Sequence, residues 1–334
     1  MKRKTRIIGI MLCCVALLSV VFVLARRRNS NGADLEAMGF FVAHEAPPAL
    51  PSAPRWITSV RDLFIKGMMP INALRMDMGT VHKELSETDL RQLSAFSDLD
   101  SLSLGDGFVG LPKNWSDYLS SWPKLEYLEI CGVNVSASDA IAISKLHKLR
   151  VLVLGSHFDE ASLMVLSTNI TLSYLALFVN PVTRSELDYL RRIPSLRRLQ
   201  VTCETSDAET AKQVVSIPQV TDLELFFSRS ECSVLTNLGT PRSLIWLTMK
   251  DMDLDQSALQ AISHLPALLY VEITDCRLRE ADLFCLTNSA TLSVLTVSHS
   301  GMTLSTKDRW RALRPNCHFE VPWQETNGGF RKAW

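Results

Sequence analysis

Hydrophobic residues recur along most of this chain in the order L-x-x-L-x-L, with Ile, Val or Met replacing Leu at some positions. The pattern begins at ten places, namely Ile71, Leu99, Leu125, Leu149, Leu172, Leu196, Val220, Leu244, Leu268 and Leu292. The intervals are 28, 26, 24 and 23 residues, followed by five of 24. A fixed period of this length indicates stacked repeats, in which each unit buries its apolar residues against its neighbours.

Each unit is predicted to contain one strand and one short helix. The alternation within L-x-x-L-x-L predicts a strand. An apolar pair three residues apart follows later in the unit, as at Leu187 and Leu190, and marks the inner face of a helix. Residues suited to cap a helix N-terminus stand before these segments, namely Ser136, Thr183, Asp207 and Asp255.

These units resemble those of leucine-rich-repeat proteins with 24-residue repeats, over about Met69 to Val321. The segments Leu172 to Leu190 and Leu268 to Leu286 carry the resemblance most clearly. It implies an α/β solenoid, with a parallel sheet on the concave face and short helices outside. The family's asparagine at the ninth unit position occurs here only as Asn180. We interpret three other residues as polar substitutes for it, namely Cys276, Ser228 and Ser300.

The pattern divides the chain into five predicted segments. These are a basic stub with a transmembrane signal anchor (1–28), a proline-containing spacer (29–54), an N-terminal cap with a first divergent repeat (55–98), the solenoid (99–321) and a C-terminal tail (322–334). This order is similar to that of bacterial membrane-anchored leucine-rich-repeat proteins. A short strand is expected in the spacer at Gly39 to Ala43.

The run Ile7 to Ala25 contains 19 residues and no charge. As a helix it would measure about 28 Å, close to the roughly 30 Å hydrocarbon core of a bilayer. Basic residues flank both ends, with the larger number before the run, so we expect a cytoplasmic N-terminus and an exported repeat domain. Cleavage after Ala25, as in a removable signal peptide, is the alternative.

The net charge of zero conceals an uneven distribution. Seven of the 35 basic residues, and no acidic residue, lie within positions 1–28. The remainder therefore has 28 basic against 35 acidic residues and carries −7. An acidic body repels phosphates, so we expect no nucleic-acid partner.

In each strand the third and fifth positions of L-x-x-L-x-L should point to the concave face. The third positions include Tyr127, Val151, Tyr174, Arg198, Asp222, Trp246 and Tyr270, and the fifth include Glu129, Glu224 and Glu272. Tyr, Trp and Arg are typical anchors of protein interfaces, so these residues predict a surface that binds a protein or peptide. The alternative is that they only pack over one another on a sheet. We interpret the glutamates mainly as solvated charges that favour a partly basic partner.

No motif of catalysis, metal binding or nucleotide binding occurs, such as H-E-x-x-H, G-x-G-x-x-G, G-x-S-x-G or paired C-x-x-C. We therefore expect no catalytic residues, no metal and no cofactor. Six cysteines lie beyond the anchor. Buried free thiols are favoured over disulfides, which an exported domain would permit. The preferred hypothesis is a membrane-anchored, non-enzymatic recognition module. A structural envelope or scaffold protein without a specific ligand is the alternative, and an enzyme is the third.

Overall fold

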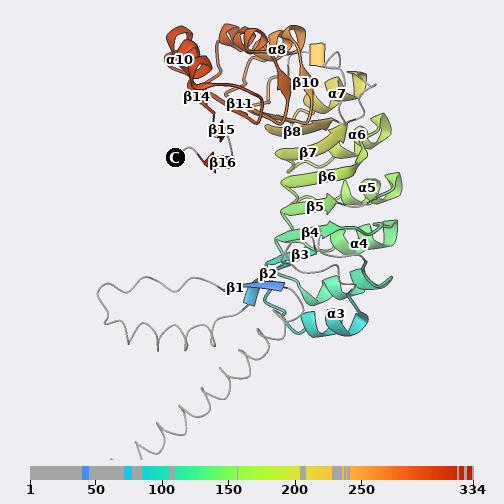
Figure 1. The fold of residues 1–334 in the computed structure, drawn as a ribbon. Helices are drawn as coiled ribbons and strands as arrows, with labels where there is room; N and C mark the ends of the chain where they lie inside the picture. Colours follow the sequence, from blue (N-terminus) through green and yellow to red (C-terminus); the bar gives the residue numbers. More distant parts are fainter. Residues whose placement is uncertain are drawn as a thin grey trace, which may run out of the picture. The chain divides into compact units, whose positions relative to one another are not determined.

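The computed structural model describes residues 40–44, 71–76, 85–104, 110–155, 157–203, 208–227, 235–236, 238, 241–321, 323–326 and 329–332. The predicted anchor, Ile7 to Ala25, lies outside these ranges. No helix within them combines the length and the apolar character needed to cross a bilayer. The chain forms two compact units, Met1–Leu128 and Glu129–Trp334. Figure 1 labels the helices and strands.

The first unit contains β1 (Phe40–His44), β2 (Ile71–Met76), α3 (Glu87–Leu93), β3 (Ser101–Leu104) and the 3₁₀ helix η1 (Trp115–Ser121). Strand β2 pairs in parallel with β3, and Ala73 lies opposite Ser101. Both are third positions of their units, so the predicted repeat begins at β2. Strand β1 pairs with β2 in the antiparallel direction. It lies one residue beyond the strand expected at Gly39 to Ala43.

The second unit consists mainly of alternating strands and short helices. Its strands are β4 (Tyr127–Cys131), β5 (Val151–Gly155), β6 (Tyr174–Pro181), β7 (Arg198–Cys203), β8 (Asp222–Phe227), β9 (Trp246–Lys250), β11 (Tyr270–Thr274), β13 (Val294–Ser298) and β14 (His318–Glu320). The first two residues of β4 belong to the first unit. Two further strands, β10 (Asp253–Leu254) and β12 (Arg277–Leu278), form a small parallel pair. The helices are α4 (Ala137–Ser144), α5 (Glu160–Leu166), α6 (Arg184–Arg191), α7 (Ala208–Val215), α8 (Gln256–Ser263), α9 (Glu280–Leu283), the 3₁₀ helix η3 (Phe284–Asn288) and α10 (Leu304–Leu313).

The strands of this unit pair in parallel and in the register that the sequence predicts. Third positions lie opposite third positions from β5 to β13, as in the series Val151, Tyr174, Arg198, Asp222, Trp246, Tyr270 and Val294. Leucines of the pattern, such as Leu175, Leu199 and Leu247, are completely buried. A shift of one residue would turn these side chains to the opposite face of the sheet, so burial of the leucines determines the register.

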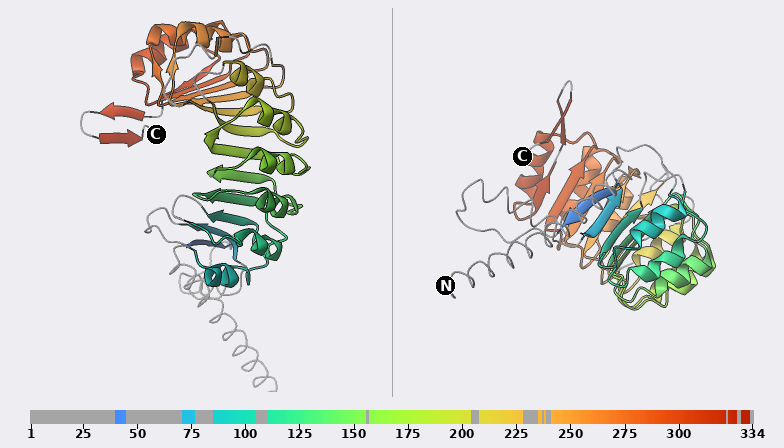
Figure 2. Two further views of the ribbon diagram at one scale, coloured as in Figure 1. Left: turned by 90° about the vertical axis from the view of Figure 1, so that its right-hand side faces the viewer. Right: turned by 90° about the horizontal axis from the view of Figure 1, so that it is seen from below.

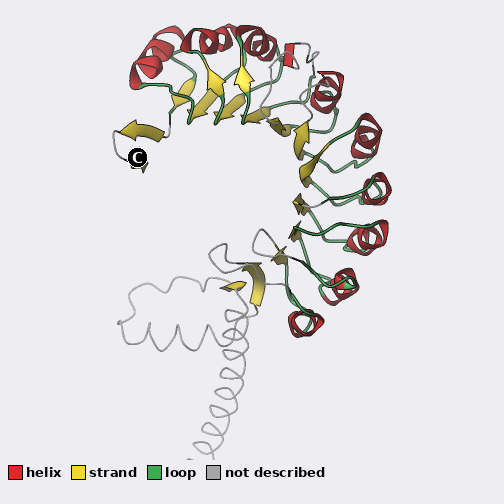
Figure 3. Ribbon diagram, turned by 45° about the vertical axis from the view of Figure 1, so that its right-hand side comes forward, coloured by secondary structure: helices red, strands yellow, loops and turns green. Residues whose placement is uncertain are grey.

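Within the second unit, the helices lie on the outer side of the curve and the sheet lines the inner side (Figures 2 and 3). Three of these helices, α4, α6 and α8, begin directly after N-cap residues that the sequence predicts. Ser136 forms a capping box with Asp139, and Thr183 forms one with Glu186. Asp255 accepts a hydrogen bond from the backbone N–H of Ala258. Asp207, the fourth predicted cap, lies outside the described residues.

The C-terminal end of the second unit adds one strand to the sheet. Strand β14 pairs in parallel with β13 and forms the last strand of the sheet. Trp310 of α10 is fully buried, and its ring lies 5.4 Å from that of Phe319. The tail contains an antiparallel pair, β15 (Trp323–Thr326) and β16 (Gly329–Lys332).

Four cysteines of the second unit carry thiols that are not joined in disulfides in the structure. Cys131, Cys276 and Cys317 are buried, and Cys285 is partly exposed. The Cys276 Sγ lies 3.5 Å from the carbonyl oxygen of Met249 in the preceding repeat. This contact fits the prediction that Cys276 replaces the family's asparagine.

Candidate functional site

The structure brings most predicted concave-face residues together in one row on the second unit. Val151, Tyr174, Asp222 and Tyr270 are half-buried, and Arg198 and Trp246 are exposed. Adjacent strands position them, because each occupies the third position of its unit. Tyr127, the remaining third-position candidate, is half-buried and belongs to the first unit.

The most exposed aromatic group of this row is formed by Trp246 and Tyr270. Their rings stack with centroids 5.0 Å apart and planes inclined by 17°. The Trp246 Nε1 donates a hydrogen bond of 3.0 Å to Thr248 Oγ1. Ile245 and Leu269, which directly precede the two aromatic residues, are also exposed. Large apolar side chains that are exposed or half-buried therefore lie at the N-terminal ends of β9 and β11.

Tyr174 and Arg198 form a second contact in the row. The Arg198 guanidinium lies over the Tyr174 ring, 4.7 Å from its centroid. The phenol hydroxyl donates a hydrogen bond of 2.5 Å to Gln200 Oε1. Burial raises the pKa of Tyr174 above its ordinary value, an effect that the Arg198 charge opposes. The arrangement orients Tyr174 along the sheet surface.

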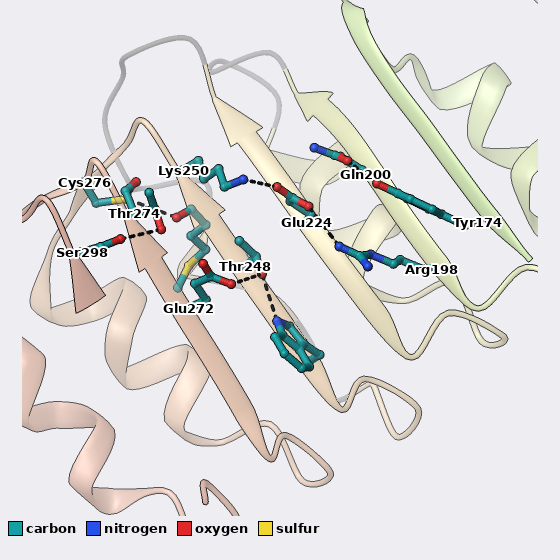
Figure 4. A network of polar contacts seen from close by, with 12 residues as sticks. Tyr174, Arg198, Gln200, Glu224, Thr248, Lys250, Glu272, Thr274, Cys276 and Ser298 are labelled. Atoms are coloured by element: carbon teal, nitrogen blue, oxygen red, sulfur yellow. Dashed lines mark hydrogen bonds and ion pairs between the residues drawn. The ribbon is translucent and has the colours of Figure 1, made fainter. Parts of the chain in front are cut away.

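Glu224 differs from the interpretation of the glutamates as solvated charges. It is buried, with 7% of its surface exposed. Lys250 Nζ lies 2.5 Å from one carboxylate oxygen, and Arg198 Nη2 lies 3.7 Å from the other (Figure 4). The interpretation is wrong for this residue because strands on both sides of β8 supply cations. A buried carboxylate requires such compensation.

The other two predicted glutamates are half-buried. Glu272 accepts a long hydrogen bond, 3.4 Å, from Thr248 Oγ1. Glu129 lies on β4. Several fifth positions are buried, namely Val153, Ala176, Gln200, Glu224 and Thr248. Long side chains from the third positions hydrogen-bond to some of them, as Tyr174 does to Gln200. The third positions therefore provide more of the accessible surface than the fifth.

Sequence reasoning missed the seventh positions, which also face the concave side. In the second unit these include Phe178, Thr202, Phe226, Lys250, Thr274 and Ser298. Lys250 Nζ lies 5.1 Å from the centroid of the Phe226 ring, which contacts Phe178 edge-on at 5.9 Å. The alternation of side chains along a strand could have revealed them. The strands continue past L-x-x-L-x-L, so the residue two places after the fifth position also faces the concave side.

A hollow of about 170 Å³ opens between Arg198, which covers Tyr174, and Trp246, which stacks on Tyr270. It is lined by Arg198, Asp222, Leu223, Glu224, Trp246 and Thr248. Three strands, β7, β8 and β9, contribute to it. The hollow combines one aromatic face, one exposed cation and two carboxylates, of which Glu224 is already paired. Most of the lining is therefore polar or charged, which suits a polar or charged group better than an apolar one.

Within the described ranges, no three His, Cys, Asp or Glu side chains are grouped closely enough to hold a metal ion. Two histidines of the second unit lie beside carboxylates, with His318 Nε2 2.7 Å from Glu320 Oε1 and His299 Nδ1 3.0 Å from Asp275 Oδ1, and neither pair lines the hollow. The chemistry that the concave face offers is therefore hydrogen bonding, charge pairing and aromatic contact.

No protein-family model matches the chain, and no curated protein matches it. Among solved structures, an internalin from Listeria monocytogenes is similar, with a TM-score of 0.40 and 16% sequence identity. The match covers 75% of this chain and 82% of the internalin. The register of the strands and the position of the short helices identify the fold independently of that likeness. The second unit is a leucine-rich-repeat solenoid.

Proposed function

We propose that this chain is a non-enzymatic recognition module that binds a protein or peptide on the concave face of its second unit. The observation that carries the proposal is the stack of Trp246 on Tyr270 at the surface of the sheet, and the residue directly before each ring in the chain, Ile245 or Leu269, is also exposed. Large apolar side chains in contact with one another at a surface mark interaction sites more often than scattered ones do. Trp and Tyr are also the residues that dominate binding energy at interfaces.

The rigidity of the site supports the same proposal. Tyr174 is held by Gln200 and Arg198, and the Trp246 indole is held by Thr248. Side chains that are already ordered lose less conformational entropy when a partner binds. A parallel sheet anchored by buried leucines provides a fixed base for them. The surface therefore suits a partner of definite shape.

Photo-crosslinking in membranes tests the proposal. A benzophenone amino acid would replace the exposed Leu269, which directly precedes Tyr270, and in a matched control would replace Met164, which is exposed on α5. We expect a defined partner to be captured from position 269 and not from position 164, and capture to be lost in Trp246→Ala. Capture only of other copies of the chain would favour a scaffold. Equal capture from both positions would contradict recognition by the concave face.

We also propose that residues 7–25 anchor the module and that the repeat domain is exported. The support is the uncharged run of 19 residues with basic flanks. After alkaline carbonate extraction, the full chain should stay in the membrane fraction and a chain lacking residues 1–28 should not. In sealed inside-out vesicles the repeat domain should resist added protease. Its digestion there would indicate the opposite orientation.

A further inference from the structure

We propose that the hollow between Arg198 and Trp246 binds the guanidinium group of an arginine side chain supplied by the partner. The guanidinium would lie on the open face of the Trp246 indole and pair with the Asp222 carboxylate. This inference rests on the proposed function, because it specifies the chemical group by which a partner is recognised. It is supported by the geometry of the indole, by the charge of Asp222 and by the position of Arg198.

The Trp246 indole has one covered face and one open face. Tyr270, on β11, stacks against one side of the ring. The hollow is lined by Trp246 together with residues of β7 and β8, which lie on the other side of β9 from β11. The face that Tyr270 leaves uncovered therefore faces the hollow. Indole is the side chain that attracts a cation over its ring most strongly.

Asp222 supplies the negative charge. The strand register places it between Arg198 and Trp246. Its carboxylate accepts a hydrogen bond of 2.6 Å from the hydroxyl of Thr221. No basic side chain in the described part of the second unit forms an ion pair with it, whereas Glu224 has two such partners. Asp222 is therefore the carboxylate of the hollow whose charge is available to a ligand.

Arg198 does not neutralise Asp222. Its guanidinium covers the ring of Tyr174 and points to Glu224, which it approaches to 3.7 Å. It forms the opposite wall of the hollow and leaves the space beside Trp246 open. The residues after position 28 carry a net charge of −7, which adds long-range attraction for a cation.

Arginine fits this site better than lysine does. A guanidinium is planar, so it can stack on the flat indole while its N–H groups pair with both oxygens of a carboxylate. An ammonium group is more strongly hydrated and has no plane to stack. The hollow opens at the surface, so a side chain can enter it from a peptide that lies along the concave face.

Fluorine NMR of the full chain labelled with 5-fluorotryptophan tests the inference. The chain has 7 tryptophans, and Trp246→Phe identifies the resonance of interest by its loss. The probe is N-acetyl-arginine amide, and the control is N-acetyl-citrulline amide, which has the same shape but a neutral head group. We expect the arginine compound to shift the Trp246 resonance saturably, with about tenfold higher affinity than the citrulline compound. Equal affinities would overturn the inference.

Two further variants separate the role of Asp222 from general effects of charge. Asp222→Asn should weaken binding of N-acetyl-arginine amide about threefold to tenfold, whereas Asp308→Asn, at an exposed position on α10, should leave it unchanged. Unchanged fluorine spectra without ligand would show that both variants fold. Binding of N-acetyl-glutamate amide in preference to the arginine compound would assign the hollow to Arg198 and contradict the inference.

The outcome also separates this inference from the proposed function. If position 269 captures the same partner from wild type and from Asp222→Asn with equal affinity, the arginine site is wrong and the recognition function stands. If the arginine compound binds the hollow but no partner is captured, the site stands and the recognition function is wrong.

Discussion

The indole of Trp246 stacks on the ring of Tyr270 at a centroid distance of 5.0 Å, although the two residues are separated by a full repeat. The pairing follows from the register, which places them directly opposite each other on β9 and β11. Both rings are accessible at the surface of the sheet, and 39% of Trp246 is exposed. A contact between exposed aromatic rings contributes less to folding than to the shape of the surface.

Trp246→Ala should therefore weaken partner binding strongly and change stability little. We expect a loss of about 2 kcal/mol or more in binding free energy and of about 1 kcal/mol in stability. Binding of the captured partner and the melting temperature of the full chain in detergent measure the two effects. Leu199→Ala is the contrasting variant, because removing this fully buried side chain should cost about 2–5 kcal/mol of stability. Comparable loss of stability in both variants would contradict the surface role of Trp246.

Glu224→Gln should destabilise the second unit more than the loss of an exposed ion pair does. The substitution leaves the half-buried Lys250 and the exposed Arg198 beside a neutral group, so we expect a cost of about 1–3 kcal/mol. Glu280→Gln, which breaks an exposed pair with Arg309, should cost at most about 1 kcal/mol. Denaturant unfolding compares them. Equal costs would show that burial of Glu224 does not matter.

Asp159 should make the stability of α5 depend on pH under acidic conditions. Hydrogen bonds from the hydroxyl and the backbone N–H of Ser162 lower the pKa of Asp159 below its ordinary value of 3.8. The stabilisation is fully present above the unfolded-state pKa and is lost as pH falls through the lower, folded-state pKa. Asp159→Asn should retain the cap and lose this acid dependence.

The matched variant Asp159→Ala should lose the cap itself. We expect a cost of about 0.5–2 kcal/mol at neutral pH. Thermal unfolding, measured from about pH 2 to about pH 7, compares the wild type with Asp159→Asn and Asp159→Ala. If Asp159→Asn shows the same acid transition as wild type, the carboxylate of Asp159 is not its source.

Gly155→Ala should destabilise the second unit because the neighbouring strand leaves no room for a methyl group. A Cβ at this position would overlap Cys131 Sγ and lie 3.1 Å from Cys131 Cβ. We expect a cost of about 1–3 kcal/mol. Cys131→Ala should relieve part of it in the double variant. Gly110→Ala, where nothing lies within 4 Å, is the control and should be nearly neutral. If the double variant loses as much stability as the two single variants together, the steric explanation is wrong.

The sequence alone determined the repeat, the phase of the strands and several helix starts. The reason is that these features depend on local periodicity: alternation assigns each side chain to a face, and Ser136, Thr183 and Asp255 cap helices through residues three positions away. The same periodicity placed Tyr174, Arg198, Asp222 and Trp246 in one row. It also implied the seventh positions, although these were recognised only in the structure.

Only the tertiary structure decided how the side chains of that row interact. Lys250 and Glu224 are 26 residues apart, and periodicity states which face they share but not that they form an ion pair. Three features depend on how side chains are oriented across neighbouring strands. They are the ion pair of Glu224 with Lys250, the stacking of Arg198 on Tyr174 and the position of Trp246 at the hollow. These contacts form only when the repeats stack. Stacking leaves Asp222, rather than Glu224, as the carboxylate available to a partner.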